Sequence, residues 1–80
     1  MKTLKEKLAY NQSRNTEFSQ GYCMGVKDYR NYVKLSEKDK KIHNESVDIF
    51  KSCASMGDQF AKGVMCGIRD AANERKAKKK

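Results

Sequence analysis

Apolar residues recur at helical spacing along most of the chain. In the clearest stretch they follow one another at steps of four, four, three and four residues: Phe18, Tyr22, Val26, Tyr29 and Val33. This spacing places them on one side of a helix and predicts a helix over residues 17–35. Proline is absent, and β-branched residues never alternate with polar ones. The chain is therefore predicted to be all-α.

Residues with helix-capping side chains divide the rest of the chain into three further helices. Thr3, with Glu6 three positions later, forms a capping box for a short helix that ends in the polar run 11–15. Ser36 precedes two acidic residues and predicts a helix over 37–55.

The predicted third helix has an apolar face that we expect to be buried: Ile42, Ile49, Phe50, Cys53 and Met56, with Val47 at its edge. Gly57 and Asp58 then predict a sharp turn into a fourth helix over 59–77, because glycine suits the position after a helix end and aspartate caps the next helix.

An internal repeat is the most informative pattern. Both copies read F-x-x-G-x-x-x-G-[VI]-[KR]-D, the first from Phe18 and the second, 42 residues later, from Phe60. Glycine inside a helix costs about 1 kcal/mol relative to alanine, and close approach of another helix would explain that cost. The alternatives are chance similarity and a binding groove along the glycines. The residues expected to pack the helices together are Gly21, Gly25, Gly63 and Gly67.

The predicted fold is a small bundle of three main helices plus a short N-terminal helix, in which helices two and four form a pseudo-symmetric, glycine-containing pair. It occupies one domain over residues 1–77. Residues 75–80, with five positive charges in six positions, are expected to form a disordered basic tail.

The segment GYCMGVKD, residues 21–28, resembles the G-Y-x-x-G-V-x-D stretch of the secreted Tai-type immunity proteins, which neutralise amidase effectors. The resemblance covers eight of 80 residues. Those proteins carry an export signal and paired cysteines, which this sequence lacks. The shared pattern is therefore interpreted as the same way of packing helices and not as membership of that family.

The positive charge of the chain indicates which residues could bind a partner. The chain has 18 lysines and arginines against 10 acidic residues, a net charge of +8. Outside the tail, basic residues line one side of helix two and recur on helix four, and an exposed tyrosine and methionine are typical of protein interfaces. The predicted partner-binding residues are Lys27, Arg30, Lys34, Lys62, Arg69, Lys76, Tyr32 and Met24. Ordinary solvated helix faces are the alternative.

No catalytic motif is present in the sequence. Phosphate-binding loops, dinucleotide fingerprints and paired His and Cys are missing, so no enzyme, cofactor or small-molecule substrate is expected. Cys23, Cys53 and Cys66 are an odd number and too widely spaced for a zinc knuckle, and His43 is the only histidine. We therefore expect free thiols, no metal and, without a leader or an apolar span, a cytoplasmic protein that does not bind a membrane.

Three hypotheses of function follow. The first is a non-enzymatic accessory or inhibitory protein that binds a macromolecular partner, a protein before a nucleic acid, as small phage and mobile-element proteins do. The second is a nucleic-acid binder that uses the basic residues and the tail. The third is a structural homo-oligomer, for which a homodimer is the expected form because a chain of 80 residues buries little surface alone.

Overall fold

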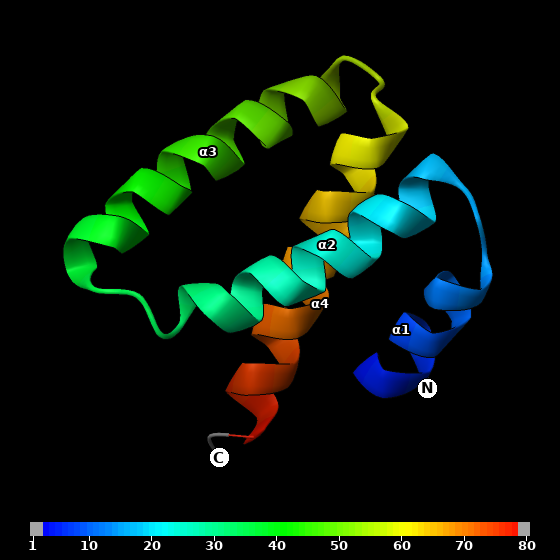
Figure 1. Ribbon diagram of the computed structural model, residues 1–80, viewed down its shortest axis with the longest axis horizontal. Coiled ribbons are helices and arrows are strands. Elements are labelled where there is room, and N and C mark those ends of the chain that lie inside the picture. Colours follow the sequence, from blue (N-terminus) through cyan, green and yellow to red (C-terminus); the bar gives the residue numbers. More distant parts are fainter. Residues whose placement is uncertain (1–2, 79–80) are drawn as a thin grey trace.

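Four helices make up the computed structural model, which describes residues 3–78 (Figure 1). They are α1 (Leu4–Ser13), α2 (Glu17–Tyr32), α3 (Glu37–Ser55) and α4 (Gln59–Lys78). No strand occurs in residues 3–78. The predicted all-α class is confirmed, and α1, with 10 residues, is the shortest of the four helices.

Each helix begins at a side chain that accepts a hydrogen bond from the backbone N–H three residues further on. The donor–acceptor distances are 3.0–3.3 Å, and the capping residues are Thr3, Thr16, Ser36 and Asp58. Glu6 accepts from the Thr3 hydroxyl, Oγ1, at 3.3 Å, whereas a capping box has the glutamate accept from the backbone N–H of the capping residue. Gly57 has a φ of 99°, so its left-handed backbone allows α3 to turn directly into α4.

Two helix ends differ from the prediction. α2 ends at Tyr32 and not at residue 35, because backbone bonds from Lys34 to Asn31 and from Leu35 to Tyr32 tighten the chain into a turn. α4 ends at Lys78, one residue beyond the predicted end, and includes residues 75–78. Alanine, lysine and arginine favour helices, and positive charge is favourable at a helix C-terminus. Residues 79 and 80 of the predicted tail lie outside the described residues.

α2 and α4 cross in close contact at the centre of the molecule, with α2 in front of α4 in Figure 1. Val26 and Val64, one from each helix, have exposed fractions of 1% and 0%. All four glycines of the repeat lie at this crossing. A Cβ at Gly21 or Gly25 would collide with the backbone of Phe60 or Val64, and Gly63 and Gly67 lie equally close to the backbone of α2. The two helices therefore approach each other closely at these four glycines.

The outer helices flank this pair and give a flat molecule, with extents of 35 × 34 × 16 Å. α1 buries Leu4 against Tyr22, Val26 and Ala71. α3 lies on the other side, where Phe50 contacts Phe60 with their ring centroids 6.5 Å apart.

The predicted buried face of α3 is wrong in part. Ile42, Ile49 and Met56 are 54%, 67% and 80% exposed, and no residue of α3 is fully buried. α3 contacts the rest of the molecule through residues such as His43 and Phe50. They lie about a quarter to a third of a turn around the helix from the three exposed residues. α3 thus has two apolar faces, and the fold uses one of them.

Candidate interaction surface

The outer side of α2 is the first candidate surface. Gly21 and Gly25 face α4, and the side of α2 that lies about a third of a turn round the helix from them points to the outside of the pair. Four residues at steps of four, three and four form a line along α2 there, and all of them are exposed: Gln20, Met24, Lys27 and Asn31. We call this line the α2 face. The α2 face combines Met24, which is 38% exposed, with the charged side chain of Lys27 and the two amide side chains.

Two further predicted residues lie near the C-terminal end of α2 but outside this line. Arg30 is exposed and borders a hollow of ≈ 310 Å³, whose apolar lining comes from Leu4, Tyr29, Val33 and Ala71. Lys34 is exposed in the turn after α2. Both add positive charge near this end of the helix.

The predicted basic residues of α4 are exposed but lie elsewhere. Lys62, Arg69 and Lys76 are roughly half a turn from the glycines of α4, as Lys27 is from those of α2. Since the glycines bring the two helices together, the basic side of α2 and that of α4 point away from each other. The structure therefore does not join the two sets of charges into one surface.

Tyr32, predicted to face a partner, contacts α3 instead. Its ring centroid lies 4.9 Å from that of His43, and Lys40 Nζ lies 5.6 Å from the Tyr32 centroid. The Tyr32 ring also packs on Tyr29, with the two ring centroids 5.8 Å apart. Tyr32 is half-buried and holds the start of α3 against the end of α2.

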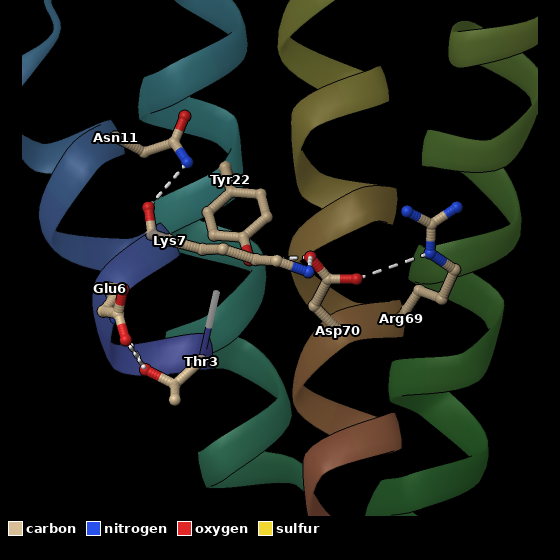
Figure 2. Close-up of polar contacts among 7 residues, drawn as sticks. All are labelled: Thr3, Glu6, Lys7, Asn11, Tyr22, Arg69 and Asp70. Atoms are coloured by element: carbon tan, nitrogen blue, oxygen red, sulfur yellow. Dashed lines mark hydrogen bonds and ion pairs between the residues drawn. The ribbon is translucent and has the colours of Figure 1, made fainter. Parts of the chain in front are cut away.

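A polar cluster ties α1, α2 and α4 together (Figure 2). The hydroxyl of Tyr22 donates a 2.8 Å hydrogen bond to Oδ2 of Asp70. Lys7 of α1 extends past the Tyr22 ring and places Nζ 3.7 Å from the same oxygen, and Arg69 lies 3.6 Å from Oδ1. Asp70 is 15% exposed, so its charge is shielded from water but paired on two sides.

Burial, and next the hydrogen bond to Asp70, raises the pKa of the Tyr22 phenol well above its ordinary value. The folded protein therefore contains Tyr22 as the neutral phenol. A donor locked onto a carboxylate in this way joins helices and offers no free acid or base to a substrate.

The thiols do not form a reactive or metal-binding group in the described chain. Cys23, Cys53 and Cys66 are free and half-buried. Burial raises the pKa of the Cys23 thiol, which is the opposite of what activates a cysteine nucleophile. Within residues 3–78, no three His, Cys, Asp or Glu side chains are grouped as metal ligands would be. The described helices also include none with the length and apolar character needed to cross a membrane.

Comparison with known proteins gives no family for this chain. It matches no protein-family model, no curated protein and no solved structure. The candidate surfaces are therefore interpreted from their own geometry and chemistry.

Sequence reasoning missed a second candidate surface on α3. Ile42, Ile49 and Met56 follow one another at steps of seven residues and form an exposed apolar line, which we call the α3 stripe. The seven-residue spacing is visible in the sequence and is typical of helices that pair with another helix. The stripe was missed because the prediction placed all the apolar residues of this helix on one broad buried face.

Proposed function

We propose that this chain is a non-enzymatic interaction protein that binds a protein partner through the α2 face and acts by occluding or bridging that partner. The observation that carries the proposal is the exposed Met24 beside Lys27 on the open side of a rigidly held helix. Methionine adapts its shape to a partner surface, and interfaces combine such apolar anchors with a polar rim.

The position of the basic residues favours a protein over a nucleic acid as the partner. A phosphate backbone is recognised by several cations on one continuous surface. Here Lys27 of α2 and Lys62 or Arg69 of α4 point away from each other, and Arg69 is also paired with Asp70 at 3.6 Å. A nucleic acid would contact one of the two sets at a time and would gain little from the other.

We further propose that the molecule consists of two related halves, α1 with α2 and α3 with α4. The contacts at the crossing support this proposal because they are reciprocal. Gly21 of α2 lies against the backbone of Phe60 in α4, and Gly63 of α4 lies against the backbone of Phe18 in α2. The 42-residue offset also relates the capping residues Thr16 and Asp58. In this view the second and fourth helices form the rigid platform that presents the α2 face.

The experiment that tests the function starts from capture of partners by the immobilised full chain in the presence of nuclease, followed by binding measurements with the purified partner. We expect one protein whose binding persists at moderate salt. Met24→Glu and Lys27→Glu should each weaken it by about tenfold or more, as expected for residues near the centre of an interface. Lys51→Glu is the matched control, because it makes the same charge change at an exposed position of α3.

Two results would overturn the proposal. One is recovery of nucleic acid alone, with affinity that falls steeply as salt is raised. The other is a protein partner whose binding responds to Lys51→Glu as strongly as to Lys27→Glu, because the α2 face would then have no special role.

A further inference from the structure

The α3 stripe is an apolar helix face that the fold itself does not use. α3 is held to the rest of the molecule by other residues, since Phe50 lies against Phe60 and His43 against Tyr32. The three residues of the stripe remain 54%, 67% and 80% exposed. At steps of seven residues they stay on one side of the helix over four turns and supply one of the two apolar positions per heptad through which paired helices contact each other.

The chain exposes more surface than a compact monomer of its size would. The accessible surface of the chain is 5877 Å². A compact monomer of 9.2 kDa is expected to expose about 4900 Å². The excess of about 1000 Å² is of the same order as the roughly 800 Å² that each partner contributes to a standard stable interface. The flat shape, only 16 Å in its shortest extent, accounts for this excess.

The charged side chains of α3 indicate which kind of partner would cover the α3 stripe. α3 carries four positive and four negative side chains: Lys38, Lys40, Lys41 and Lys51 against Glu37, Asp39, Glu45 and Asp48. The whole net charge of +8 therefore lies outside α3. Two copies of so basic a chain repel each other wherever they meet except at a surface where the charges cancel. An acidic partner, in contrast, would be drawn to the basic surfaces and not to α3.

We propose that the α3 stripe is the contact between two copies of this chain, which pair α3 against α3 in a homodimer. The same stripe then covers itself in both subunits, as two-fold symmetry requires. The proposal is independent of the partner site, because the α2 face lies on another helix and shares no residue with the α3 stripe.

Sedimentation equilibrium of the full chain at micromolar concentrations tests the proposal. We expect a species of twice 9.2 kDa. Ile49→Lys should raise the dimer dissociation constant by about 100-fold or more, since each dimer receives the substitution twice. Asn44→Lys, which adds the same charge at an exposed position on another side of α3, should change it by less than about threefold. Ile49 is 67% exposed, so circular dichroism should show an unchanged helix content.

Ile49→Gln provides a second variant without added charge and should weaken the dimer by about tenfold. A chain that stays monomeric at all concentrations overturns the proposal, as does a dimer that both lysine variants weaken equally. Binding of the protein partner is measured separately with the α2 variants, so failure of the dimer leaves the proposed function standing and the reverse also holds.

Discussion

Gly63 of α4 lies directly against the backbone carbonyl of Phe18 in α2, and a Cβ at Gly63 would also come within 2.8 Å of the Tyr22 nitrogen. The atoms that would be struck belong to a helix backbone, so no side-chain rotation can relieve the overlap. Gly21 stands in the same relation to the carbonyl of Phe60. The closeness of α2 and α4 therefore depends on the missing side chains of these glycines.

Gly63→Ala should consequently destabilise the protein. Alanine favours a helix interior by about 1 kcal/mol over glycine, but overpacking a tight contact costs about 1–3 kcal/mol and here pushes two backbones apart. Because the clash is with backbone atoms, we expect the upper end of that cost and a net loss of about 2 kcal/mol in the free energy of unfolding, measured by urea denaturation. Ser46→Ala, at an exposed position inside α3, is the control and should change stability by less than about 0.5 kcal/mol. A Gly63→Ala protein more stable than the original would contradict the close packing.

The bond from Tyr22 to Asp70 predicts a dependence of stability on alkaline pH. Because the folded-state pKa of Tyr22 is raised, its contribution is complete below the unfolded pKa of about 10 and is lost as pH rises toward the folded pKa. Tyr22→Phe should lower the free energy of unfolding at neutral pH by about 1–2 kcal/mol, the usual contribution of such a bond. It should also make the decline above about pH 10 shallower than in the original protein.

Urea denaturation at about pH 8 and about pH 10.5 measures both effects. Tyr10→Phe serves as the control, because Tyr10 is 50% exposed and lies outside the buried cluster. It should retain the full alkaline decline. Equal slopes in the two variants would mean that Tyr22 does not supply the pH dependence.

The cap of α4 has a predictable contribution of its own. Asp58 accepts from the Ala61 N–H at 3.0 Å and places a negative charge at the positive end of the helix. Asp58→Ala should reduce the free energy of unfolding by about 1 kcal/mol in thermal or urea denaturation. Asp48→Ala removes an exposed carboxylate from the middle of α3 and should have a much smaller effect. Equal losses would show that overall charge, and not capping, is responsible.

Local features were predictable from the sequence because their causes lie within a few residues. Thr3 with Glu6, Ser36 and Asp58 satisfy the first N–H groups of their helices wherever the helices lie in space. The glycine repeat was informative for a related reason, since close packing would offset the cost of four glycines inside helices.

Relations between helices were not predictable in the same way. Tyr22 and Asp70 are 48 residues apart, and nothing in their spacing indicates that they meet. The basic residues Lys27 and Arg69 occupy equivalent positions on two separate helices, which suggested one surface. Their true directions depend on how α2 and α4 cross, and a helical pattern contains no information on that angle.

The last prediction concerns the mobility of α3. α3 has no fully buried residue, whereas Val26 of α2 and Val64 of α4 are at most 1% exposed. In dilute protein, amide hydrogens of α3 should exchange through local opening, and those near Val26 and Val64 only through global unfolding. Phe50→Ala removes the ring that packs on Phe60 and should speed exchange across α3 by about tenfold or more. Exchange near Val26 should change far less, because α2 and α4 are held by their own glycine contact. If Phe50→Ala accelerates α2 and α3 alike, the two helices open as one unit, and α3 is then an integral part of the core and not a separately held helix.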